Sequence, residues 1–139
     1  MDPQVVEYLA RVTPGLTVAE VVTWLQARTP VKQVRETWGP DPDDVDAYLH
    51  VTQYDVKLLP GNDELPPEQI ESVAYGPAFP GVVNQIRMGM TGDQVEQILG
   101  PPDRLWPMPH ENYVLIYDQP RFFRADLDRE TEQVIAMFR

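Results

Sequence analysis

The sequence has 139 residues and no cysteine, and this absence excludes several kinds of chemistry. Without cysteine the chain cannot form disulfides, a thiolate metal site, a cysteine nucleophile or the lipidated N-terminus of a bacterial lipoprotein. Serine is almost absent too. Ser72 is the only serine, no nucleophile-elbow glycines surround it, and His50 and His110 lie far apart in the sequence. The sequence therefore does not predict a hydrolytic triad, and we expect a protein that is not an enzyme.

Metal and cofactor signals are weak as well. The stretch DPDDVD, residues 41–46, is rich in the oxygen ligands that calcium prefers. Its spacing fails, however, because Val45 stands where an oxygen ligand is needed and Asp46 where the invariant glycine of a calcium loop belongs. No glycine-rich phosphate loop is present. We predict no metal site and no cofactor.

Long apolar runs are missing. No stretch approaches the roughly 18 apolar residues of a membrane span, and the start, MDPQVVEYLARV, lacks the basic and apolar regions of a signal peptide. The sequence therefore predicts a cytoplasmic protein that does not bind a membrane.

Positive charge is scarce, with 11 Lys and Arg against 22 Asp and Glu, a net charge of −11. The excess is concentrated in residues 36–71, which hold ten acidic residues and one basic residue. Nucleic acid is an improbable partner for such a chain, whereas a protein with a basic surface is favoured.

The first 35 residues are typical of a helical hairpin. Asp2 and Pro3 form a helix start, and apolar residues then recur at helical spacing to about Thr13. Thr17 with Glu20 forms a capping box for a second helix, which should end before Pro30. Trp24 is expected in the core.

The middle of the chain predicts a β-hairpin between acidic loops. Residues 36–46 read as an exposed loop, residues 54–58 alternate as a strand, and residues 69–75 as the returning strand. A short apolar segment, residues 82–87, is expected to be helical.

The stretch GMTGDQVEQILGPPDRLW, residues 89–106, specifies a helix with marked ends. Thr91 and Gln94 form a capping box, and Gly100 followed by two prolines ends the helix. Three β-rich runs follow at 112–118, 121–127 and 133–138, the pattern of an antiparallel meander. Its arginines and aspartates, Arg121 and Asp126 among them, are expected to form cross-strand pairs.

Together these elements predict an α+β fold of one compact domain. Its parts are an N-terminal helical hairpin (1–35), acidic loops with a β-hairpin (36–81), and a helix packed on a three-stranded antiparallel meander (82–139), the last arranged in two layers.

The motif IRMGMTGDQVEQILGPP resembles the signature of the SmpA/OmlA or BamE family of outer-membrane-assembly lipoproteins. The resemblance covers about residues 82–139 and implies a helix-helix-three-strand fold. Related modules inhibit secreted enzymes. The wider arrangement, with YDVKLL, GPAFPGVV and DRLWPMP around the motif, is similar to small proteins from toxin-immunity loci of Gram-negative bacteria.

These features lead to the hypothesis of an immunity protein that neutralises a cognate toxin, with a basic surface, by occluding its active or substrate-binding surface. The alternative is an envelope-assembly or scaffold module of the SmpA/OmlA type, and a small enzyme or ligand-binding domain comes third. Acidic side chains would steer the toxin and aromatic ones would anchor it. The expected partner-binding residues are Trp38, Asp41, Asp43, Asp44, Asp46, Tyr48, Asp63, Glu64, Glu68 and Trp106. A solvated acidic loop, and a Trp106 that merely covers the edge of the meander, are the competing interpretations.

Overall fold

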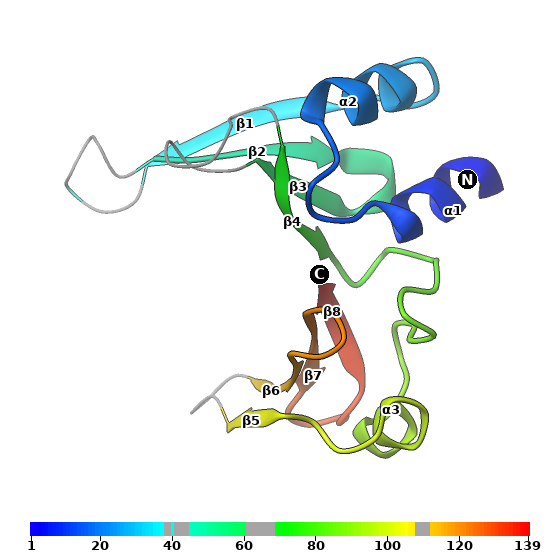
Figure 1. Cartoon of the computed structure of the whole chain (residues 1–139), viewed down its shortest axis with the longest axis vertical. Helices are drawn as coiled ribbons and strands as arrows, with labels where there is room; N and C mark the ends of the chain where they lie inside the picture. Colours follow the sequence, from blue (N-terminus) through cyan, green and yellow to red (C-terminus); the bar gives the residue numbers. More distant parts are fainter. Residues whose placement is uncertain (38–39, 41–44, 61–68, 108–111) are drawn as a thin grey trace.

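A computed structural model describes residues 1–37, 40, 45–60, 69–107 and 112–139. Within these ranges eight strands form one antiparallel sheet of order β1-β2-β3-β4-β8-β7-β6-β5, accompanied by three short helices (Figure 1). The strands are β1 Lys32–Thr37, β2 Val45–Val51, β3 Val56–Pro60, β4 Ile70–Tyr75, β5 Arg104–Pro107, β6 Asn112–Tyr117, β7 Phe123–Asp128 and β8 Val134–Phe138. The helices are α1 Pro3–Arg11, α2 Val18–Gln26 and α3 Gly92–Leu99, and a 3-10 turn, η1, spans Thr52–Tyr54.

The predicted arrangement of a separate β-hairpin and a two-layer, three-stranded meander is wrong. The two halves merge into one sheet because β4 pairs with β8, with Ala74 opposite Phe138 and Tyr75 opposite Met137. The backbones of Val73 and Arg139 continue this ladder with two hydrogen bonds of 2.9 and 3.0 Å. The C-terminal half also has four strands, since β5 adds to the edge of β6.

Two strands that the sequence pattern missed, β1 and β5, lie at the edges of the sheet. Residues 36–46 were expected to be a loop, but Glu36 and Thr37 end β1, and Val45 and Asp46 begin β2. β1 reads KQVRET, and its polar side chains leave no apolar alternation. Lysine and other polar side chains are typical of protected edge strands, so β1 carries little hydrophobic signal.

The helix starts are as predicted. The Asp2 carboxylate accepts a hydrogen bond from the Gln4 N–H at 2.9 Å and caps α1, and the Thr17 hydroxyl accepts one from Glu20 N–H and caps α2. At α3 both halves of the capping box form, since Thr91 N–H donates to the Gln94 side chain at 2.9 Å and Gln94 N–H to Thr91. Each of these signals acts within one turn, which is why the sequence is sufficient to reveal it.

The helix predicted for residues 82–87 is absent. Val83 and Ile86 instead form a tight turn closed by two backbone hydrogen bonds of 2.8 Å. Asn84 and Gln85, at its tip, have φ angles of 52° and 70°. Val83 and Ile86 are both buried, so their spacing of three imitates a helical stripe. The segment 76–91 is therefore an extended connector between the two halves (Figure 1).

All three helices lie on one side of the sheet (Figure 1). Beneath them one continuous core joins α1 and α2 residues such as Leu9 and Leu25 to Tyr75, Leu127 and other strand residues. In the C-terminal half α3 contributes Val95 to the same core. The opposite face of the sheet is not covered by any described helix, and we call it the open face.

Trp24 was expected in the core, and the structure places it at the border of the core, where it packs against the buried residues. It is half-buried on α2, its ring stacks on that of Tyr8 at 3.8 Å between centroids, and the Arg28 guanidinium lies 4.0 Å from its ring. The stack fastens α1 to α2 at the surface of the helical hairpin.

The helices of the described residues are all too short or too polar to cross a membrane.

Candidate functional site

The strand registers align one row of side chains across the open face. Partners in an antiparallel ladder point to the same side of a sheet, so a continuous chain of partners shares a face. The row consists of Lys32, His50, Lys57, Ala74, Phe138, Arg124, Ile116 and Arg104, one from each strand in sheet order. Four of these eight side chains are Lys or Arg, which concentrates scarce positive charge on one face of an acidic protein.

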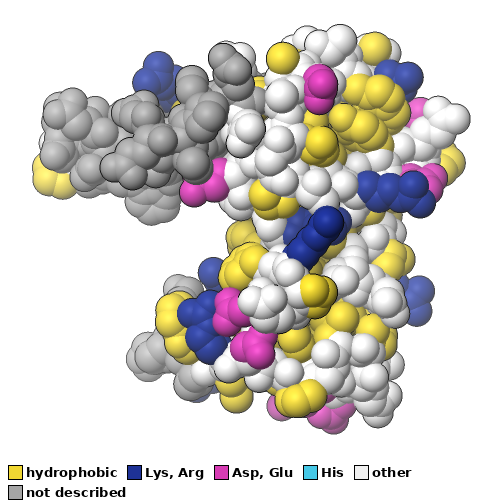
Figure 2. Space-filling model, viewed as in Figure 1, with side chains coloured by type: hydrophobic (Ala, Val, Ile, Leu, Met, Phe, Trp, Pro, Cys, Tyr) yellow, Lys and Arg dark blue, Asp and Glu magenta, His cyan; other side chains and the backbone are white. Residues whose placement is uncertain are grey.

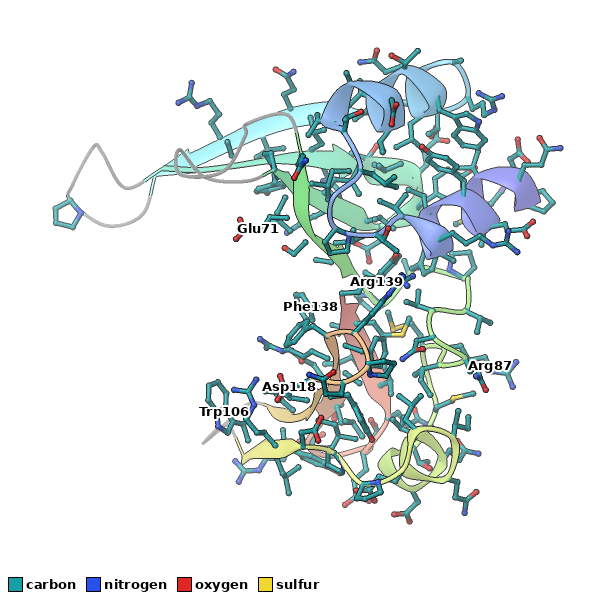
Figure 3. The ribbon with its side chains drawn as sticks, in the orientation of Figure 1. Glu71, Arg87, Trp106, Asp118, Phe138 and Arg139 are labelled. Carbon is teal, nitrogen blue, oxygen red and sulfur yellow. The ribbon has the colours of Figure 1, made fainter. Side chains whose placement is uncertain are left out.

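At the β5 end of this row, aromatic and charged side chains form the group that we call the Trp106 cluster. Arg104 Nη2 lies 2.9 Å from Asp118 Oδ1, and its guanidinium is 6.0 Å from the centroid of the Trp106 ring. The other members of the cluster are Arg124, Asp126 and Phe138. Figure 3 shows Trp106, Asp118 and Phe138 on the side of the C-terminal half that faces away from α3.

A two-pronged ion pair fixes Arg124 within the cluster. Its Nε and Nη2 donate to the two carboxylate oxygens of Asp126 at 2.7 and 3.0 Å. Its guanidinium also lies 4.6 Å from the centroid of the Phe138 ring. Both contacts hold the arginine in one orientation, as bidentate pairing and stacking on an aromatic ring do in general.

Two apolar side chains form the floor of the cluster. Val114 and Ile116 are 1% and 3% exposed, although they lie on the open face and outside the main core. Their register partners Trp106, Arg104, Arg124 and Asp126 surround them. Trp106 itself is 53% exposed. The Trp106 side chain thus lies next to buried apolar residues, with about half of its surface available to a partner.

The other end of the open face carries Tyr48, His50 and Lys57. The ammonium of Lys57 is 5.0 Å from the centroid of the Tyr48 ring. His50 lies between Lys32 and Lys57 in the row, and its buried Nε2 has no hydrogen-bond partner among the described residues. In the described ranges no group of three or more acidic or histidine side chains is placed to hold a metal ion.

Two of the residues expected to bind a partner lie on this face with their side chains described. Trp106 is on β5 and Tyr48 is on β2. These strands lie near opposite ends of the strand order, so the structure does not bring the two side chains together. Asp46 lies in β2, where only its backbone is described. The remaining expected residues lie outside the described ranges: Trp38, Asp41, Asp43, Asp44, Asp63, Glu64 and Glu68.

Sequence reasoning missed the partners of Trp106. The arginines and aspartates of this region were expected to pair across strands, whereas Arg124 and Asp126 pair along one strand, two residues apart. The alternation in RFFRADL contained this signal, because Arg124 and Asp126 share the face opposite Phe123. Arg104 and Phe138 could not be assigned to the Trp106 cluster from the sequence, because their place in it depends on the registers of the strands.

We expect Arg124→Ala to lower the free energy of unfolding by about 1–2 kcal/mol, because it leaves the Asp126 carboxylate, 9% exposed, without its counter-ion. Arg124→Ala combined with Asp126→Ala should cost less than the sum of the two single variants. The matched control is Arg104→Ala, whose pair with Asp118 is 48% and 43% exposed and should contribute less than about 1 kcal/mol. Urea unfolding measures all four variants, and additive losses would show that the Arg124–Asp126 pair is not coupled.

The chain was compared with family models, curated proteins and solved structures. None of the three comparisons finds a match. The resemblance to the SmpA/OmlA signature therefore stays a prediction, and the function is inferred from the geometry of the open face.

Proposed function

We propose that this protein is a non-catalytic binding protein whose open face docks onto a partner protein, and that it acts as an immunity protein that occludes a cognate toxin in the cytoplasm. The single observation that carries the proposal is the half-exposed Trp106 next to the buried floor of Val114 and Ile116. Tryptophan, tyrosine and arginine contribute most of the binding energy in protein interfaces, typically from a dry centre.

The fixed arginines strengthen this proposal. Arg104 and Arg124 are already oriented by Asp118 and Asp126, so a partner that hydrogen-bonds to them does not have to order two long side chains. Because each guanidinium is paired, the cluster presents alternating charges and does not repel a basic partner. Half-exposed aromatic surface beside oriented arginines suits protein recognition better than it suits chemistry.

The acidic stretch has a separate role in the proposal. Residues 36–71 carry ten acidic residues and one basic residue. The negative electrostatic potential of such a stretch increases the association rate with a basic toxin. Affinity would come from the Trp106 cluster and association rate from the acidic stretch, so the two contributions can be measured separately.

The experiment is capture of the partner from the native host with the tagged protein at moderate salt, followed by affinity measurement with the purified partner. Trp106→Ala should raise Kd about tenfold or more. Leu105→Ala is the matched control, because Leu105 is 57% exposed on the same strand and points to the opposite face. Its Kd should change less than about threefold, since isolated rim contacts contribute little.

A stoichiometric toxin whose activity the wild-type protein blocks and Trp106→Ala blocks poorly would support the proposal. Equal changes in Kd for Trp106→Ala and Leu105→Ala would show that the partner does not bind at the open face. Recovery of outer-membrane assembly proteins in place of a toxin would replace the immunity role with the envelope-assembly role.

A further inference from the structure

Three adjoining hollows surround a second pair of arginines, Arg121 and Arg139. The largest, about 860 Å³, lies between α1 and the connector, and one of about 560 Å³ lies beside β4. A third of about 180 Å³ borders the turn between β6 and β7. Both arginines line all three hollows, which we call together the waist groove. Figure 2 shows Lys or Arg side chains at this waist, between the half that carries α1 and the half that carries α3.

The walls of the waist groove are largely apolar. Val6 and Ala10 of α1 face Pro80 and Val82 of the connector across the largest hollow. Val82 is 51% exposed, and Phe122, which lines the two smaller hollows, is 46% exposed. Apolar walls with a few convergent polar groups are typical of binding sites. The largest hollow is open to solvent along one side, so it suits a chain segment better than an enclosed small molecule.

The two central arginines differ in what they already bind. Arg139 Nη1 donates to the carbonyl oxygen of Ala10 at 2.6 Å, and its side chain points from the end of β8 toward the α1 half (Figure 3). Arg121 is exposed, and no described residue accepts a hydrogen bond from its side chain or forms an ion pair with it. The guanidinium of Arg121 is therefore ready to bind an anion.

Acidic side chains do not neutralise the groove. Its lining contains Arg11, Arg121 and Arg139 against Glu7 and Glu71, and Glu7 is already bound to Arg11 at 2.8 Å. The lining thus has more basic than acidic side chains, whereas the whole chain has twice as many acidic as basic residues. An apolar groove lined by a guanidinium that has no partner in the described part of the chain is complementary to an apolar segment that carries a carboxylate.

We infer that the waist groove binds a peptide segment of another protein in which an Asp or Glu is flanked by apolar residues. The carboxylate pairs with Arg121, where a two-pronged hydrogen bond is possible, and the apolar flanks lie against α1 and the connector. The groove adjoins the helix side of the sheet. The inference therefore does not depend on docking at the open face.

The test uses a phage-displayed library of random twelve-residue peptides, selected on the full-length protein. Enriched peptides should contain Asp or Glu between apolar residues. A synthetic copy should bind Arg121→Ala about tenfold more weakly than the wild type, with affinity that falls as salt rises. Arg87→Ala is the matched control, because Arg87 is an exposed arginine of the same connector that points away from the groove (Figure 3). The Arg87→Ala variant should bind the synthetic peptide with the same affinity as the wild type.

Charge reversal sharpens the result. Arg121→Glu should lose the acidic peptides and enrich peptides with Lys or Arg in the same place. Because Arg121 is exposed in a turn, neither variant should alter folding, and far-UV circular dichroism checks this. Enrichment of peptides without acidic residues, no enrichment at all, or acidic peptides that bind Arg121→Ala as tightly as the wild type would each overturn the inference. If Trp106→Ala did not change the affinity for the captured partner, the proposed function would fail but the inference about the waist groove would still stand.

Discussion

Phe79→Ala is expected to lower the free energy of unfolding by about 3–5 kcal/mol, the range for removing a buried aromatic ring. Phe79 is 2% exposed, and its ring lies 4.8 Å from that of Tyr75. A Cβ atom added at Gly81 would lie only 2.6 Å from the Phe79 ring and 2.9 Å from Val6 Cγ1. The buried ring therefore packs closely against Gly81 of the connector, next to Val6 of α1.

Urea unfolding followed by circular dichroism measures this loss. Phe122→Ala is the matched control, because it removes the same ring from a site that is 46% exposed, and it should cost less than about 1 kcal/mol. A loss of stability for Phe79→Ala as small as that for Phe122→Ala would mean that the packing of the connector does not depend on Phe79. A large loss for Phe79→Ala alone would identify the connector as part of the cooperative core.

The helices and the C-terminal strands were predictable because their signals are local. Asp2, Thr17 and Thr91 each cap a helix through a partner two or three residues away. The runs that became β6, β7 and β8 alternate or are apolar over a few residues, and short turns separate them. In contrast, Asn84 and Gln85 adopt positive φ angles, which nothing in the sequence of residues 82–87 reveals.

The joining of β4 to β8 depends on residues more than 60 positions apart, such as Ala74 and Phe138. No local pattern specifies such a pair, so the sequence predicted two separate sheets where one forms. The candidate site shows the same limit. Trp106 was identified from its type and its loop, but Phe138 and Arg124 join it only through the registers of β8, β7 and β6.

The buried hydroxyl of Tyr75 gives the protein a predictable loss of stability at alkaline pH. It donates to the carbonyl oxygen of Leu9 at 2.6 Å and so ties α1 to β4. Burial raises the pKa of Tyr75 from 10.0 to about 12, although the nearby Arg139 guanidinium opposes the shift. Below pH 10 the folded and unfolded states both keep the proton. Between pH 10 and 12 the unfolded state loses it first, so stability falls as pH rises.

Tyr75→Phe should separate this effect from every other titration. At pH 8 the variant is expected to be about 1–2 kcal/mol less stable, because the Leu9 carbonyl oxygen loses its donor. Between pH 8 and 12 the wild type should lose roughly 2 kcal/mol more than the variant, from 1.36 kcal/mol per pKa unit. Tyr117, whose pKa burial also raises to about 12, is present in both proteins and cancels in the comparison. Urea midpoints measured from pH 8 to 12 decide the matter: convergence of the two curves places the alkaline loss at Tyr75, and parallel curves place it elsewhere.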